Sequence, residues 1–174
     1  MKKNLGIGSI CLLLGIMMFS SSSNSRAADA PAFMVSGLIM QMLTFEKSLM
    51  SKSGDLSIHV VGSKAIADEL TKSIGTPIAK CKLSKVTQSN DLPKEKIDVL
   101  VIADPDMVDK AIAYTRAEKI LSITSKPELV EKGVSLGIGM NETGGQSIIV
   151  NMTASKEEGL DWKPAILKIA KAVQ

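Results

Sequence analysis

The sequence predicts a single α/β domain whose mostly parallel central sheet carries a C-terminal β-hairpin and flanking helices. Within Ile97–Ala103, the residues from Val99 on are apolar without alternation, as in a strand buried on both faces of a parallel sheet. Asp104 and Pro105 follow directly, and these residue types favour the start of a helix. Strand-like and helix-like patterns alternate on both sides of this stretch, which favours one layered α/β structure.

The first 27 residues are predicted to be a cleaved signal peptide, which leaves residues 28–174 as the folded domain. Lys2 and Lys3 precede the apolar run Ile10–Phe19, which is too short to span a membrane. The leader holds three of the 21 basic residues and none of the 18 acidic ones, so the exported chain is formally neutral. We therefore expect a periplasmic protein without a nucleic-acid partner.

Residues 32–50 are expected to form the first helix, because apolar side chains recur there at helical spacing. The core-facing stripe is Val35, Leu38, Ile39, Met42, Phe45 and Leu49. Phe33, Met34 and Met40 widen this stripe beyond what packing on one sheet face requires. We expect these three residues to form an interface with a partner or a second copy; the alternatives are a copper-binding methionine face and a helix that packs only on the sheet.

Two strands and one helix are expected between the first helix and the central strand. The first strand is Leu56–Gly62, with alternating faces. Ser63 can cap the helix that follows, and Gly75 stands where a left-handed C-cap belongs. Residues 78–86 alternate as a second strand, and their three lysines place this strand near a sheet edge.

The second half of the chain continues the alternation. A helix is expected after Pro105, with a buried stripe that ends at Thr115. The remaining predicted elements are a strand at 120–124, a helical turn at 127–132, a hairpin of 134–140 and 147–152 with its turn at 141–145, a short helix at 153–160, and a closing amphipathic helix that buries Trp162, Ile166, Ile169, Ala170 and Val173.

Motifs for catalysis or cofactor binding fail on inspection. Gly137 and Gly139 begin like a dinucleotide fingerprint, but Glu142 stands where the next glycine is required and no helix follows. Gly139 to Gly144 has the P-loop spacing, but Gly145 replaces the lysine. No serine lies in a nucleophile-elbow pattern. We therefore expect no enzyme, no catalytic residue, no cofactor and no metal.

Three isolated polar features have both a functional and a structural interpretation. His59 is the only histidine, and a hydrogen-bonded side chain is favoured over a metal ligand, because a metal site needs several ligands. Cys81 is the only cysteine outside the leader and is expected to be buried and inert, without an internal disulfide. Asp104 and Asp106 lie where α/β folds often place ligands, but a helix cap is favoured.

Blocks of the second half resemble the YfiR-like family of small periplasmic proteins. The resemblance is carried by the order and spacing of Ile97–Ile102, Ile120–Ser125, Gly133–Gly137, Ile148–Asn151, Gly159-Leu160 and Ile166–Ala170. It extends more weakly back to Ala32. Asp98 stands where the family often has a cysteine, so a redox switch between paired cysteines cannot operate with Cys81 alone.

The resemblance implies a non-enzymatic regulator that acts on the periplasmic sensor region of an inner-membrane signalling protein, such as a diguanylate cyclase or a sensor kinase. It also implies a homodimer. The alternative function is a periplasmic small-molecule-binding protein, with its ligand near Asp104 and Thr124 at the carboxyl ends of the strands.

Overall fold

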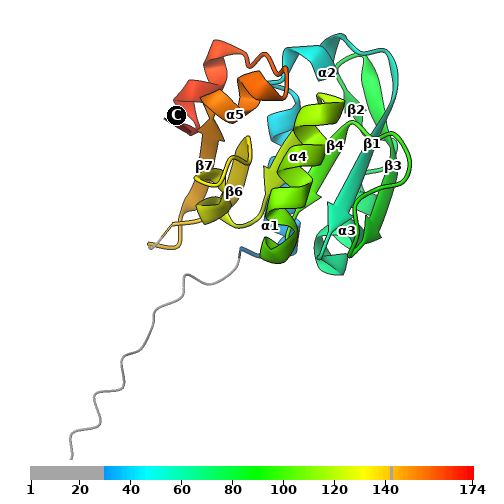
Figure 1. The fold of residues 1–174 in the computed structure, drawn as a ribbon. Helices are drawn as coiled ribbons and strands as arrows, with labels where there is room; N and C mark the ends of the chain where they lie inside the picture. Colours follow the sequence, from blue (N-terminus) through cyan, green and yellow to red (C-terminus); the bar gives the residue numbers. More distant parts are fainter. Residues whose placement is uncertain (1–29, 142) are drawn as a thin grey trace, which may run out of the picture.

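A computed structural model describes residues 30–141 and 143–174, which form one eight-stranded sheet and the helices that cover it (Figure 1). The strand order is β2-β3-β1-β4-β5-β6-β7-β8. Pairing is parallel from β3 to β6 and between β7 and β8, whereas β2–β3 and β6–β7 pair antiparallel. The strands are β1 (Gly54–Val61), β2 (Pro77–Ile78), β3 (Cys81–Ser89), β4 (Val99–Ile102), β5 (Leu121–Thr124), β6 (Leu136–Met140), β7 (Gln146–Asn151) and β8 (Lys171–Val173). The predicted fold class is confirmed.

Helices cover both faces of this sheet. On the first face, called the α1 face, α1 (Ala32–Leu43) and α3 (Lys64–Thr71) pack over the larger apolar cluster. On the opposite face, called the α4 face, α4 (Val108–Glu118) and the 3-10 helix η2 (Pro127–Val130) pack over a second cluster (Figure 1). The shorter elements are α2 (Lys47–Ser51), η1 (Pro105–Met107), α5 (Met152–Glu157) and η3 (Pro164–Lys168). The predicted leader lies outside the described residues.

The predicted central strand is β4, which lies between β1 and β5 with all four residues buried. Asp104 ends it as expected, because its Oδ1 accepts a hydrogen bond of 3.0 Å from the amide of Asp106. The helix that follows β1, α3, packs on the α1 face of the sheet, whereas the helix that follows β4, α4, packs on the opposite face. The carboxyl ends of these two strands therefore border a crevice.

The helix predicted over residues 32–50 is interrupted, which corrects the sequence interpretation. α1 ends at Leu43, and Glu46 has an extended backbone before α2 begins. The buried Glu46 carboxylate explains the break: Oε2 accepts from the amide of Leu49 at 2.6 Å and Oε1 from the amide of Asp161 at 3.0 Å. A continuous helix would not leave Glu46 free to cap α2.

The single strand predicted over residues 78–86 is also wrong in detail. Ala79 has a positive φ of 56°, which turns the chain between β2 and β3. The two-residue strand β2 occupies the sheet edge, and the lysine-containing β3 lies one position inside it. A left-handed alanine gives no turn signal in the sequence, because glycine or asparagine is the residue expected there.

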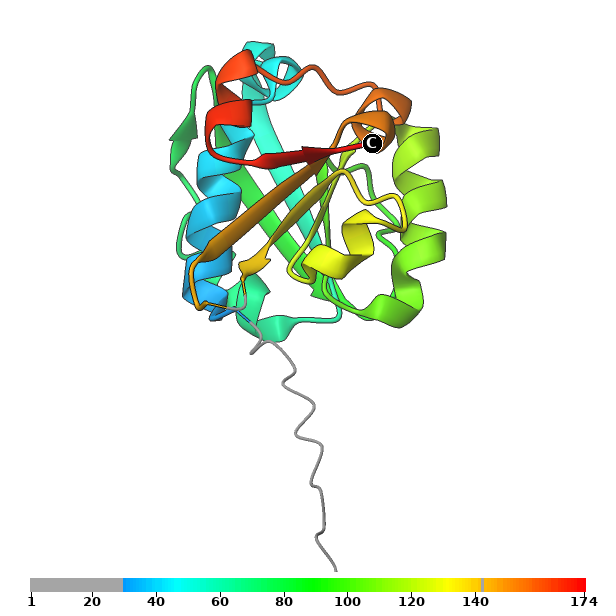
Figure 2. The ribbon, with the colours of Figure 1, turned by 90° about the vertical axis from the view of Figure 1, so that its left-hand side faces the viewer.

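The predicted closing helix is replaced by η3 and β8. Pro164 begins η3, which ends at Lys168, and β8 then pairs in parallel with β7 at the edge of the sheet (Figure 2). Trp162 and Ile166 are buried as expected, whereas Ile169 is 43% exposed. Apolar spacing alone could not separate a helix from a short helical turn followed by a strand.

The glycines of the rejected dinucleotide motif have a packing role. A Cβ atom at Gly137 would lie 2.4 Å from Cγ2 of Val130, and one at Gly139 would lie 2.5 Å from Cγ of Pro127. Both contacts are shorter than carbon atoms tolerate, so η2 can pack on β6 only because these two positions lack side chains.

Candidate interaction surface

The exposed side of α1 carries no charged residue. Val35, Ile39 and Met42 are fully buried against the sheet, while the opposite side of the helix is open to solvent. No residue from Ala32 to Leu43 is acidic or basic. Helices at a protein surface normally present charged side chains to water, so an uncharged exposed side is unusual.

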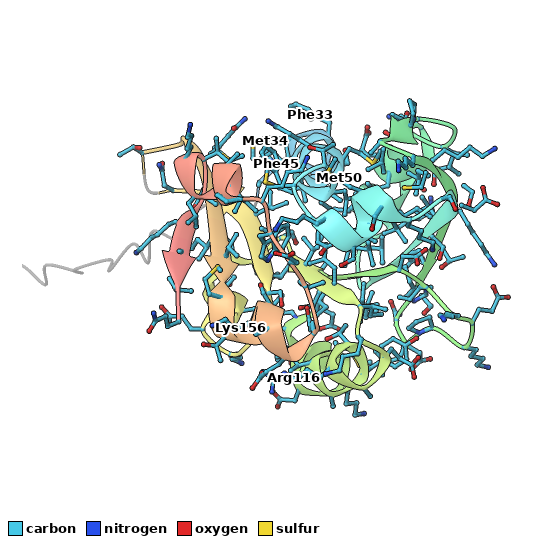
Figure 3. The ribbon with its side chains drawn as sticks, turned by 90° about the horizontal axis from the view of Figure 1, so that it is seen from above. Phe33, Met34, Phe45, Met50, Arg116 and Lys156 are labelled. Carbon is cyan, nitrogen blue, oxygen red and sulfur yellow. The ribbon has the colours of Figure 1, made fainter. Side chains whose placement is uncertain are left out.

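The three predicted interface residues lie on or beside this open side. Phe33 points outward and is 68% exposed. Met34 and Met40 are half-buried and pack at the border of the core, on either side of Phe33 around the helix. Figure 3 shows Phe33 and Met34 near the outer edge of the molecule. Their role in an interface stays a prediction.

The segment around η3 lies at the C-terminal end of α1, a feature that sequence reasoning missed. The backbones of Trp162 and Glu46 form an isolated antiparallel β-bridge, and Lys163 Nζ donates to the Thr44 carbonyl at 3.1 Å. The helix η3 therefore lies at the C-terminal end of α1 (Figure 2). Leu167 is 53% exposed beside it. The name α1–η3 surface is used below for Phe33, Met34, Gly37, Met40, Leu167 and Ile169.

His59 is hydrogen-bonded, as the sequence favoured. Its Nδ1 lies 2.7 Å from the Thr87 hydroxyl, and its Nε2 lies 3.1 Å from both Ser89 Oγ and the carbonyl oxygen of Asp91. The carbonyl can only accept, so Nε2 carries the proton and Nδ1 accepts from Thr87. Burial lowers the pKa of His59 below its ordinary value, an effect that the hydrogen bond to Asp91 partly opposes. The neutral side chain thus holds the end of β3 and the following loop.

Cys81 is buried, as predicted. Its Sγ donates to the carbonyl oxygen of Ile78 at 3.1 Å, and burial raises the pKa of the thiol. A raised pKa disfavours the reactive thiolate. Within residues 30–141 and 143–174, no group of three or more His, Cys, Asp and Glu side chains is arranged to hold a metal ion.

At the carboxyl ends of the strands, the side chains of Thr124 and Asp104, which were expected near a ligand, form hydrogen bonds within the protein. The Thr124 hydroxyl is buried and donates to the carbonyl oxygen of Ile102 at 2.8 Å, and Asp104 caps η1. A pocket of about 360 Å³ does open at this edge. Its lining residues are Ala30, Ala32, Gly62, Ser63, Ala65, Ile66, Ala103, Ser125 and Lys126.

A buried carboxylate at the opposite end of the sheet was not foreseen. Glu158 is fully buried, and its oxygens accept from the hydroxyls of Thr115 and Ser135 at 2.6 Å and from the amide of Ser122 at 3.0 Å. Burial raises its pKa, although these hydrogen bonds favour the charged form. The only sequence signal was the presence of polar residues such as Ser122 within apolar strands.

Comparison with known families decides the relationship. The model of the YfiR/HmsC-like family matches residues 38–171, which is most of the chain. The chain belongs to this family. YfiR/HmsC-like proteins are known as periplasmic regulators, and the family is generally regulatory rather than catalytic. The match begins within α1 and includes η3.

One solved structure supports the fold of this YfiR/HmsC-like chain. A conserved domain protein from Vibrio cholerae O1 biovar El Tor strain N16961 aligns with a TM-score of 0.51 at 19% identity, covering 83% of this chain and 60% of that one. The chain thus spans less than two thirds of that protein. No curated protein matches. Among the described residues, no helix has the length and apolar character needed to cross a bilayer.

Proposed function

We propose that this YfiR/HmsC-like protein represses an inner-membrane signalling protein, a diguanylate cyclase or a sensor kinase, by binding its periplasmic sensor region through the α1–η3 surface. The observation that carries the proposal is the uncharged open side of α1, where Phe33 is 68% exposed. Family membership supports a regulator, and the polar side chains of His59, Cys81 and Glu158 are engaged in internal hydrogen bonds.

The test is complementation of a deletion strain with surface variants, followed by measurement of cyclic-di-GMP or of the kinase output. Phe33→Asp should fold normally, because its side chain lies in solvent, but should fail to restore repression. Met40→Asp should also fail, with some loss of stability because Met40 is half-buried. The matched control is Ile74→Asp, which alters another exposed apolar residue, 46% accessible and outside this surface.

Restored repression by Phe33→Asp, with normal circular dichroism, would show that α1 serves only for packing. Light scattering of the same variants separates the implied homodimer from the partner complex. If Phe33→Asp keeps the wild-type molecular mass and loses only repression, the surface belongs to the partner. If it becomes monomeric, the surface joins two copies.

Binding of a small molecule in the crevice at the carboxyl ends is the second candidate. The observation in its favour is the pocket of about 360 Å³, into which Lys126 and the hydroxyl-bearing Ser63 and Ser125 contribute. Under this function, Lys126→Ala would change the signalling output and Phe33→Asp would not.

A further inference from the structure

We infer that the α1–η3 surface receives an amphipathic helix whose acidic residues pair with Lys168 and Lys171. This inference rests on the proposed function and specifies the chemistry of the partner. It starts from an uneven distribution of charge: residues 32–43 carry no charge, while residues 163–174 contain three lysines and no acidic residue. Residues 28–174 as a whole are formally neutral, so the segment 163–174 that adjoins this surface is more positive than the average of the protein.

The lysines at the η3 end differ in what they contact. Lys163 donates to the Thr44 carbonyl at the end of α1. Lys168 and Lys171 form no ion pair with an acidic residue in the described part of the chain. Two free cations beside exposed Leu167 and Ile169 complement a partner that combines apolar side chains with carboxylates.

The shape of α1 favours a helix as the occupant. Phe33, Gly37 and Gln41 follow one another at intervals of four residues along its exposed side. A Cβ atom built on Gly37 meets no other atom within 4 Å, so a gap lies between the two larger side chains. Side chains of a second helix can insert into such a gap when ridges pack into grooves. The outer edge of β8 offers only three residues for strand addition.

The experiment uses the protein purified from the periplasmic fraction and two labelled synthetic peptides. Both peptides are helical and share one leucine stripe; one carries glutamates beside the stripe and the other carries lysines. Fluorescence anisotropy should show the acidic peptide binding at least about tenfold more tightly. The double variant Lys168→Glu, Lys171→Glu should reverse this preference. Gly37→Trp should abolish binding of both peptides, because the indole fills the gap.

Two controls isolate the surface. Lys110→Glu with Lys132→Glu reverses two exposed lysines that lie outside the α1–η3 surface and should leave the preference unchanged. Gly37→Ala fills little of the gap and should retain binding. The inference would be overturned if the two peptides bound equally well. It would also be overturned if Lys110→Glu with Lys132→Glu lost the preference for the acidic peptide. So would light scattering that shows a wild-type dimer dissociated by Gly37→Trp, since a second copy would then occupy the surface.

The cell assay separates failure of this inference from failure of the proposed function. If Lys168→Glu with Lys171→Glu represses normally while Phe33→Asp does not, the surface binds a partner of different chemistry and only the inference falls. If Phe33→Asp also represses normally, the proposed function itself fails.

Discussion

The half of the α4 face over β4 and β5 is closed by a helix, whereas the half over β1 and β3 is closed by a loop (Figure 1). Under the helix, Leu100, Ile102 and Ile112 form an apolar contact. Under the loop at 93–97, the strands present Ser57, His59 and Thr87 around a pocket of about 190 Å³. An apolar contact does not depend on pH, while a polar network does, so the two halves should differ in how acid affects them.

Leu100→Ala should have the largest effect, because it removes a fully buried side chain from the helix-covered half. Large-to-small substitutions of this kind cost about 2–5 kcal/mol of unfolding free energy. The loss should be the same at pH 5 and pH 7 when measured by urea denaturation. A loss confined to one pH would show that the apolar half is coupled to a titrating group.

Glu158→Ala should come next, since it leaves the hydroxyls of Thr115 and Ser135 and the amide of Ser122 without their buried acceptor. We expect a loss of about 3 kcal/mol in the free energy of unfolding. The control is Glu157→Ala, which removes only the half-exposed ion pair with Arg116 and should cost less than about 1 kcal/mol. Equal losses would show that the buried oxygens contribute nothing special.

Glu158 also predicts a pH effect with a definite sign. Its pKa in the folded protein is raised, so the unfolded chain releases this proton first as the pH rises. Glu158 therefore contributes its full stabilisation below pH 4.5, the ordinary pKa of a glutamate. This stabilisation falls as the pH rises from 4.5 to the higher pKa of the folded protein. Glu158→Gln should remove this decline from the pH profile of the melting temperature.

His59 should give the smallest effect, with the opposite sign. Its pKa is lowered in the folded protein, so the unfolded chain binds a proton first as the pH falls. Stability should therefore decrease as the pH falls below the ordinary value of 6.5 and level off below the folded pKa. His59→Gln should flatten this part of the profile while Leu100→Ala leaves it unchanged. An unaltered slope in His59→Gln would mean that another group in the loop-covered half titrates.

Sequence reasoning located elements whose signals are local. The strand at 97–103, the caps at Ser63 and Asp104, and the hairpin turn that contains Gly144 were each predicted and are present. The break at Glu46 and the strand β8 were missed, because both depend on residues distant in the sequence. Helical spacing could not show that residues 171–173 would pair with β7 as a strand.

The candidate surface was predictable only in part. Phe33, Met34 and Met40 were identified because they exceed the width of a core-facing stripe. Leu167 and Ile169 were not, since a helix at the C-terminus would have turned Ile169 toward the sheet. Glu158 was missed because a glutamate normally indicates the surface of a protein.

The hydrogen bond between Glu46 and the amide of Asp161 joins positions 115 residues apart. While the chain is being synthesised, Oε2 of Glu46 can already accept from the nearby amide of Leu49, whereas Oε1 has no partner until the distant segment follows. Contacts of such long range slow folding, because a large loop must close before they form. The N-terminal helix pair therefore cannot be completed until nearly the whole domain has been made.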